Sequence, residues 1–305
     1  MPPSDQYRKQ ASLLVRTLPH VASEDCFALK GGTAINLFIR NMPRLSVDID
    51  LTYVPVQSRK DSLAAIDAAM KRIAETARGK SPVEDVATAT PNKEGAVTRL
   101  LARGNGVQIK IEVTPVVRGC VFEPETRSVT PTVEDTFGFA EMQVVSFPDL
   151  YGGKIVAALD RQHPRDLFDM RDLLAHEGID DDLRRAFLVY LLSHDRPMHE
   201  VVTPRRKDIV REFERGFAGM TTEPVALDAL LAAREETVDT IIGQMPDDHR
   251  RFLVTFEQGE PDWSLLGLDH VRDLPAIRWR QLNLDRLDPA ARAKLVENLK
   301  RSLGL

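Results

Sequence analysis

The feature that most limits the possible folds is a glycine pair followed by two aspartates in an alternating strand pattern. The glycines lie in Leu29–Ala34 and the aspartates in Ser46–Leu51. Side chains alternate between the two faces of a strand, so Asp48 and Asp50 share one face and the aliphatic residues point into the core. Neighbouring carboxylates repel unless a cation lies between them. Because glycine lets the backbone approach phosphates, the pattern predicts a Mg²⁺-dependent nucleotide site.

A second strand supplies a third carboxylate. Residues 96–103 and 107–113 alternate in character, and the Gly104–Gly106 turn between them is typical of a β-hairpin. Val107, Ile109, Ile111 and Val113 occupy one face of the second strand, and Glu112 lies on the other. We expect Asp48, Asp50 and Glu112 to bind the metal ions.

Composition places the chain among globular proteins. Its 305 residues suffice for one large domain or two ordinary ones, with 43% hydrophobic and 29% charged residues. No apolar run is long enough for a membrane span, and Met1–Gln6 lack the layout of a signal peptide. Cys26 and Cys120 are expected as buried thiols without a disulfide. These features predict a cytoplasmic protein with no membrane contact.

The order of predicted elements indicates two parts of different character. Up to residue 145 we expect an α+β core, a mixed β-sheet with flanking helices; residues 146–305 form a mainly helical domain. The expected helices of the first part span 6–18, 34–39 and 58–78. Those of the second span 150–160, 166–175, 181–194, 205–216, 224–243 and 246–257, followed by a tail over 262–302. Pro164 is expected to start a helix, since proline is tolerated in the first turn.

These residues have the chemistry that nucleotidyl transfer requires. Two metal ions held by carboxylates activate the attacking hydroxyl and hold the triphosphate. The N–H groups of Gly31 and Gly32 and the Thr33 hydroxyl are expected to bind the β- and γ-phosphates. Ser46 is expected to hydrogen-bond a carboxylate. Lys154 is the candidate cation for the departing pyrophosphate.

Each piece alone also has an ordinary structural explanation. A glycine pair is common in turns, Asp-x-Asp is common at solvated surfaces, and a helical lysine usually faces water. Asp166 and Asp169 could serve as a helix cap with a surface ion pair. The ordered combination of these pieces is what favours a catalytic site.

The same residues carry a family resemblance. The chain resembles nucleotidyltransferase toxins of the AbiEii/AbiGii group, which includes MenT-type toxins of toxin–antitoxin systems. The resemblance lies in Lys30–Ala34, Arg44–Leu51, Ile111–Pro115, Lys154 and Arg165–Asp169, and covers about residues 28 to 172. The stretch Leu274–Leu284 resembles the C-terminal region of some members.

The resemblance implies a polymerase-β-like core with a helical C-terminal domain that contributes Lys154 and Asp166 to the site. Asp48 and Asp50 would bind Mg²⁺, Gly31, Gly32 and Thr33 the NTP phosphates, and Lys154 the triphosphate. The essential later aspartate is Asp166, with Asp169 as the alternative. The implied reaction adds nucleotides to the 3′ acceptor end of tRNA, which blocks aminoacylation and translation. The implied partners are NTP, tRNA and a cognate antitoxin protein.

Two other functions stay open at this point. The chain could transfer a nucleotide or a phosphoryl group to a protein acceptor, including the antitoxin, or it could bind nucleotide or RNA without catalysis. Because the net charge is −5, tRNA binding requires a local basic groove. Its expected residues lie between core and helical part: Arg40, Arg44, Arg205, Arg206, Lys207, Arg278 and Arg280. Trp279 is expected in the core; the alternative is that it stacks on a terminal base. We expect helix-end or surface positions for His163, His194 and His199.

Overall fold

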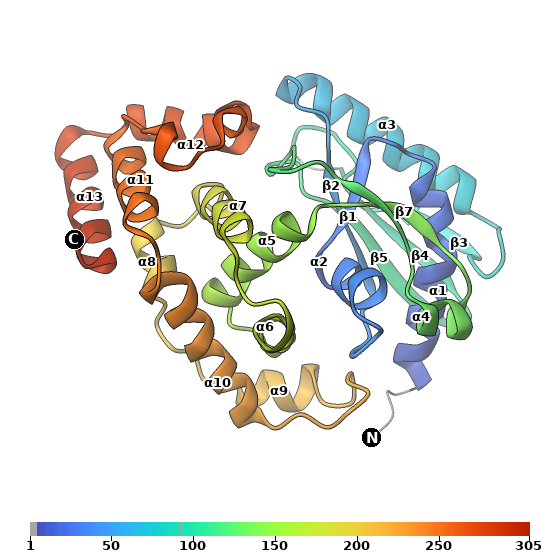
Figure 1. Cartoon of the computed structure of the whole chain (residues 1–305). Helices are drawn as coiled ribbons and strands as arrows, with labels where there is room; N and C mark the ends of the chain where they lie inside the picture. The colour runs from blue at the N-terminus through green and yellow to red at the C-terminus, as the bar shows by residue number, and fades with distance from the viewer. Residues whose placement is uncertain (1–4, 92) are drawn as a thin grey trace. The chain divides into compact units, whose positions relative to one another are not determined.

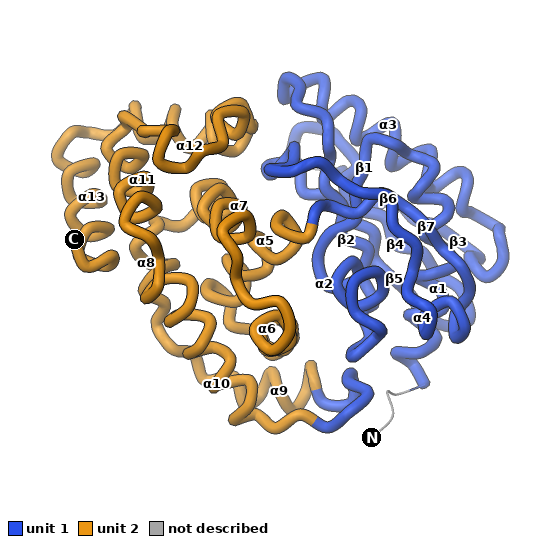
Figure 2. Tube along the Cα trace, in the orientation of Figure 1, with its two compact units in different colours: residues 1–146, 218–224 blue, residues 147–217, 225–305 orange. Residues whose placement is uncertain are grey.

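The computed structural model describes residues 5–91 and 93–305 (Figure 1). Met1–Ser4 and Asn92 lie outside the described residues. The prediction that Met1–Gln6 are not a signal peptide therefore falls mostly outside them. The chain divides into two compact units (Figure 2). The first runs to Ser146 and also takes in Ala218–Pro224; the second consists of Phe147–Phe217 and Val225–Leu305. The prediction divided the chain once, into residues 1–145 and 146–305. It did not include the return of Ala218–Pro224 to the first unit.

A mixed seven-stranded sheet forms the centre of the first unit, in the order β3-β4-β5-β2-β1-β7-β6. Strand β1 is antiparallel to β2 and parallel to β7, and β2 is parallel to β5. The strands are β1 Phe27–Lys30, β2 Asp48–Tyr53, β3 Asp85–Thr88, β4 Arg99–Gly104, β5 Val107–Val113, β6 Glu125–Ser128 and β7 Glu141–Val144. This sheet confirms the α+β prediction for the first part of the chain.

The helices of the first unit are α1 Asp5–Ala22, α2 Gly31–Ala34, α3 Arg59–Ala77 and α4 Pro131–Phe137, with a π-helical turn over Ile35–Ile39. Helix α1 contacts β5 and β7, and α3 contacts β3 and β4. Leu13 and Ile66 are buried in these helices, as are Ile49 and Ile111 in the sheet. The alternation predicted for β2 and β5 therefore places their aliphatic side chains in a core covered by helices.

The hairpin of β4 and β5 has the predicted turn. Gly104 pairs with Val107, and Asn105 and Gly106 between them have φ values of 52° and 72°. Both angles lie in the left-handed region that two-residue hairpin turns require. The predicted start at Ala96 was wrong, because the strand begins at Arg99.

The segment Ala218–Pro224 fixes the chain that leads into β2. The Leu45 amide donates to the Met220 carbonyl at 2.9 Å, and the Thr222 amide donates to the Pro43 carbonyl at 3.0 Å. The backbone just before the aspartate strand is thereby hydrogen-bonded on both sides of Arg44.

The second unit is helical, as predicted. Its helices are α5 Phe147–Asp160, α6 Pro164–His176, α7 Asp181–Leu192, α8 Met198–Val202, α9 Val210–Gly216, α10 Leu227–Val238, α11 Asp247–Gln258, α12 Pro275–Asp285 and α13 Pro289–Leu303. Pro164 is the first residue of α6, which confirms its predicted place. The helix predicted from residue 205 was too long, since α9 begins at Val210.

Helices α5 and α7 pack closely because Gly152 lies between them. A Cβ atom on Gly152 would lie 2.8 Å from the Phe187 amide nitrogen, so only glycine permits this approach. No helix among residues 5–91 and 93–305 has both the length and the apolar character needed to cross a bilayer.

Two side-chain predictions need correction. Trp279 is 56% exposed on α12, so its predicted place in the core was wrong. The apolar side of α12 is formed instead by Ala276, Ile277 and Leu284, which are buried. Cys26 and Cys120 form no disulfide, as predicted, but both are only half-buried.

Candidate active site

Gly31 occupies the junction between β1 and α2. Its φ of +73° lies in the left-handed region, which other residues enter only with strain. A Cβ atom here would also lie 2.8 Å from Oδ2 of Asp50. The glycine is therefore required twice, once by its own backbone and once by the close approach of the Asp50 carboxylate.

Gly32 is packed against a buried arginine. A Cβ atom on Gly32 would lie 2.8 Å from a terminal guanidinium nitrogen of Arg44 and 3.2 Å from Oγ of Ser46. Arg44 is 2% exposed and donates to the Leu45 carbonyl at 3.1 Å. Its predicted place in a solvent-facing RNA groove was wrong, because the guanidinium lies within the fold behind the glycine loop.

The Thr33 hydroxyl ties the glycine loop to the aspartate strand. Thr33 is fully buried, its hydroxyl donates to the main-chain carbonyl of Asp48, and it lies 2.9 Å from the Ser46 hydroxyl. A hydroxyl has one proton, so Ser46 supplies the proton of the second hydrogen bond. Thr33 and Ser46 thus hold α2 and β2 at a fixed distance.

The polar face of the sheet carries a row of charged residues across four strands, with two acidic residues flanked by two basic ones. In the register of the sheet Lys30 pairs with Asp50, Asp50 with Glu112, and Glu112 with Arg99. Asp48 pairs with Lys110 in the next row. Residues opposite each other in a sheet present their side chains on the same face. Asp48 and Asp50 thus lie on a charge-balanced surface, where Lys30 and Lys110 offset part of their mutual repulsion.

Glu112 is held by two of these cations. Arg99 contacts its carboxylate at 2.5 Å and Lys110 at 2.8 Å. Burial by itself raises the pKa of Glu112, but the hydrogen bonds from Lys110 and Arg99 outweigh it, and the pKa lies below its ordinary value. Burial by itself lowers the pKa of Lys110. The hydrogen bond to Glu112 and the negative charges of Asp48 and Asp50 outweigh burial and raise this pKa above its ordinary value.

Asp48 and Asp50 suit a Mg²⁺ ion that arrives with a nucleotide. Both are half-buried and lie on one face of β2 beside Gly31. Mg²⁺ is usually bound through one or two carboxylates together with substrate phosphates and water. Within residues 5–91 and 93–305 no three His, Cys, Asp or Glu side chains are grouped as a metal site. The arrangement of this face therefore fits a two-carboxylate site completed by the substrate better than a closed protein cage.

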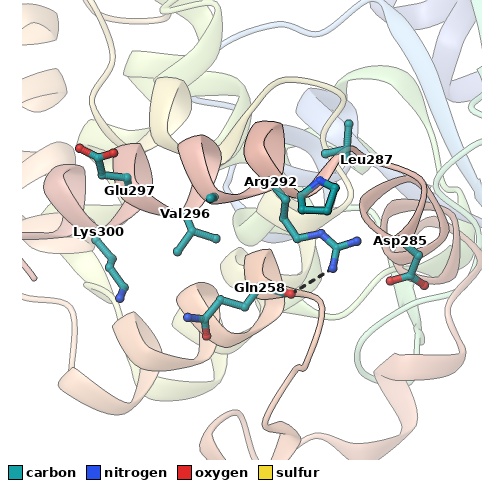
Figure 3. Close-up of a pocket in the computed structure, with 9 residues that line it drawn as sticks. Gln258, Asp285, Leu287, Arg292, Val296, Glu297 and Lys300 are labelled. Atoms are coloured by element: carbon teal, nitrogen blue, oxygen red, sulfur yellow. Dashed lines mark hydrogen bonds between the residues drawn. The ribbon is translucent and has the colours of Figure 1, made fainter.

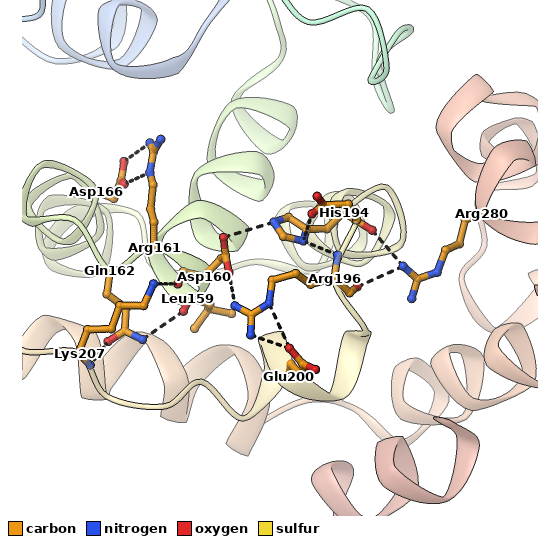
Figure 4. Close-up of polar contacts among 11 residues, drawn as sticks. Leu159, Asp160, Arg161, Gln162, Asp166, His194, Arg196, Glu200, Lys207 and Arg280 are labelled. Carbon is orange, nitrogen blue, oxygen red and sulfur yellow. Dashed lines mark hydrogen bonds and ion pairs between the residues drawn. The ribbon is translucent and has the colours of Figure 1, made fainter. Parts of the chain in front are cut away.

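The second unit contains a separate buried charge cluster around Lys154. The Lys154 ammonium lies 3.0 Å from Asp166 and 3.1 Å from Asp169, and all three side chains are at most 6% exposed. Arg161 forms a bidentate ion pair with Asp166: its Nε lies 2.5 Å from Oδ2 and its Nη2 lies 2.9 Å from Oδ1 (Figure 4). Although burial opposes ionisation, Lys154 and Arg161 hold the pKa of Asp166 well below its ordinary range. The surface interpretation of Lys154, Asp166 and Asp169 was therefore wrong, since all three are buried.

Three arginines and one histidine of the second unit make contacts within the fold. Arg280 donates to the carbonyls of His194 and Arg196 at 3.0 and 3.2 Å, and Arg196 pairs with Asp160 and Glu200 (Figure 4). Arg206 pairs with Glu235 at 2.6 Å. His163 caps α6 by accepting from the Arg165 amide at 3.1 Å, which confirms its helix-end role.

Three side chains around the aspartates and Glu112 were missed by the sequence interpretation: Lys30, Arg99 and Lys110. Lys110 is the one that could have been found, because it lies two residues before Glu112 on the same face of an alternating strand. The other two become neighbours of the site only through strand register, which one sequence does not reveal.

Together the sheet, the glycine turn and the paired aspartates define the class of protein, a nucleotidyltransferase. The chain belongs to the family of nucleotidyl transferase AbiEii toxins of type IV toxin–antitoxin systems, whose model matches residues 12–280. It is thus a toxin of such a system, which implies an antitoxin partner.

One solved structure supports the fold. MenT4, a nucleotidyltransferase toxin from Mycobacterium tuberculosis H37Rv, superposes with a TM-score of 0.59 at 18% identity, over 91% of this chain and 94% of MenT4. A nucleotidyltransferase structure from H. pylori superposes with a TM-score of 0.47 at 15% identity, over 80% of this chain and 99% of that one. A comparison with curated protein sequences finds no match.

Proposed function

We propose that the protein is a Mg²⁺-dependent enzyme that transfers nucleotides from NTP to the 3′ acceptor end of tRNA, which blocks aminoacylation and translation. The observation that carries the proposal is the placement of Asp48 and Asp50 on one face of β2, with the Asp50 carboxylate against Gly31. A nucleotide bound at the glycine turn would have its phosphates beside both carboxylates.

Each group of this face has a distinct part in the proposal. Asp48 and Asp50 hold Mg²⁺, which neutralises phosphate charge and activates the acceptor hydroxyl when bound. The first N–H groups of α2, at Gly31 and Gly32, have no acceptor within the helix and donate to the phosphates. Thr33 and Ser46 keep the turn in place. Lys30, opposite Asp50 in the sheet, is a further cation at the edge of this site.

The parts of Glu112, Lys154 and Asp166 stay predictions: that of Glu112 rests on the alternation of its strand, that of Lys154 on its charge and on the resemblance, and that of Asp166 on the resemblance alone. Glu112 as a third metal ligand has to give up contacts with Arg99 and Lys110. Lys154 as a ligand of the triphosphate has to give up a contact with Asp166 or Asp169. Loss of transfer without loss of folding in Lys154→Met would support the triphosphate role.

The experiment that tests the proposal is incubation with Mg²⁺, each labelled NTP in turn, and either total tRNA or a protein fraction that contains the antitoxin. The products are separated on sequencing and protein gels. We expect label at the tRNA 3′ end from the wild type and none from Asp48→Asn. Label in protein alone would instead support a protein acceptor, and nucleotide binding without any product would support a non-catalytic module.

A further inference from the structure

A small basic hollow lies at the start of α6 in the second unit. It has a volume of about 360 Å³ and is lined by His163, next to the first residue of α6, and by Arg211, Glu212, Arg215 and Gly216 of α9. All of these residues belong to the second unit, so the hollow is complete within that unit.

The two arginines of the hollow have no side-chain partner in the part of the chain that the structure describes. Arg211 and Arg215 are exposed and lie one helical turn apart on the same side of α9. Among the described residues neither guanidinium forms a hydrogen bond or an ion pair, although Glu212 is three residues from Arg215. Like charges at this spacing destabilise a helix. An anion bound between them would remove that repulsion.

His163 adds a third donor. Its Nδ1 accepts a hydrogen bond from the Arg165 amide, so the proton of the neutral ring is on Nε2. That Nε2 is 3.9 Å from the point where a Cβ of Gly216 would lie. Because Gly216 has no side chain, α9 approaches the imidazole closely at this point.

A larger hollow in the same unit lacks these properties. It has a volume of about 710 Å³ and lies between α11 and α13 (Figure 3). Its lining carries two acidic side chains, Asp285 and Glu297, beside Arg292 and Lys300, and Arg292 donates to the Gln258 carbonyl at 3.3 Å. The charges of this hollow therefore balance, whereas the α9 hollow, formed by His163, Arg211, Glu212, Arg215 and Gly216, carries a net positive charge that suits an anion.

We propose that the α9 hollow binds a phosphate group of the RNA backbone. This inference rests on the proposed function, since it names the surface that holds the RNA acceptor. The Asp166 amide donates to the His163 carbonyl at 2.8 Å, so the hollow lies within one helical turn of the Lys154–Asp166 cluster. Arginine pairs bind phosphate through charge and through several N–H donors at once.

The test is RNA binding by the full chain, measured by fluorescence anisotropy with labelled tRNA at several salt concentrations. Replacing both arginines (Arg211→Gln with Arg215→Gln) should weaken binding roughly ten-fold and lower the magnitude of the salt slope by about 1, the value for one lost phosphate contact. Glu212→Gln, which removes the one acidic side chain of the hollow, should strengthen tRNA binding. The KM for tRNA should follow these changes, whereas the KM for NTP should not.

The matched control is Lys294→Gln with Arg301→Gln on α13, which removes the same charge from exposed positions. It should change affinity and salt slope much less than the α9 pair. An unchanged salt slope in the α9 double variant, with tRNA labelling intact in the wild type, would overturn this inference and leave the proposed function standing. A raised KM for NTP with unchanged tRNA binding would assign the hollow to nucleotide phosphates instead. A wild type that neither binds nor labels tRNA would overturn both.

Discussion

The Thr33 hydroxyl donates a hydrogen bond to the main-chain carbonyl of Asp48, and this bond joins the glycine turn to the carboxylate strand. It joins two backbone segments that a nucleotide would have to contact at once. Thr33→Val keeps the shape of the side chain and removes the donor. We expect a loss of about 1–2 kcal/mol in the free energy of unfolding. We also expect a fall in kcat of roughly ten-fold or more, because small displacements of reacting groups are costly.

Thr33→Ser is the control, since it retains the hydroxyl. Steady-state transfer assays and urea denaturation of both variants provide the measurements. Equal kcat in Thr33→Val and wild type would show that the bond does not position the site.

Gly31→Ala should disturb the site beyond its effect on backbone strain. The new Cβ would lie 2.8 Å from Asp50 Oδ2, so the carboxylate has to move. Gly79→Ala is a matched control, because Gly79 has a similar φ of +70° but nothing within 4 Å of its Cβ position. Both variants should lose about 1 kcal/mol from left-handed strain. Transfer activity should fall only in Gly31→Ala; a comparable fall in Gly79→Ala would indicate a general loss of folding.

Glu112→Gln distinguishes a third metal ligand from a residue that balances charge. In the structure the Glu112 carboxylate contacts Arg99 and Lys110, so we expect Glu112→Gln to retain most of the activity that Asp48→Asn loses. The Mg²⁺ concentration for half-maximal transfer should change little in Glu112→Gln. If instead the two variants are equally inactive and the Mg²⁺ requirement of Glu112→Gln rises steeply, Glu112 is a metal ligand.

The two central strands could be predicted from the sequence alone, whereas several short strands and side-chain contacts could not. The alternation in Ser46–Leu51 and Val107–Val113 predicted both central strands, since one buried face leaves a clear period of two. Strands β3, β6 and β7 have four residues each, too few for a recognisable pattern. The contact of Arg99 with Glu112 depends on strand register, and the burial of Arg44 depends on the return of Ala218–Pro224. Those are long-range relationships, and local sequence does not encode them in a readable form.

The buried pair of Lys154 and Asp166 should make stability depend on acid pH. The pKa of Asp166 is lower in the folded protein than in the unfolded chain, because Lys154 and Arg161 outweigh burial. Its contribution is therefore fully present above the ordinary carboxyl pKa and is lost as the pH falls below it. Asp166→Asn should lower the free energy of unfolding at pH 7 by about 3–5 kcal/mol, the usual cost of breaking a buried pair.

Urea denaturation between pH 3 and pH 7 measures this dependence. The difference between wild type and Asp166→Asn should shrink toward the acid end. Asp182→Asn, at an exposed position near the start of α7, should follow the wild type throughout. A constant difference across the range would mean that the ionised form of Asp166 is not the stabilising one.

The most direct test of the central claim is transfer of a labelled nucleotide to tRNA whose terminal ribose diol is either intact or oxidised with periodate. The reaction is run with Mg²⁺ and with EDTA, for wild type and for Asp48→Asn and Asp50→Asn variants whose folding has been verified. We predict label only for wild type with Mg²⁺ and intact tRNA. Equal labelling by wild type and by either aspartate variant would contradict the assignment of the site, and labelling of oxidised tRNA would contradict transfer to the 3′ end.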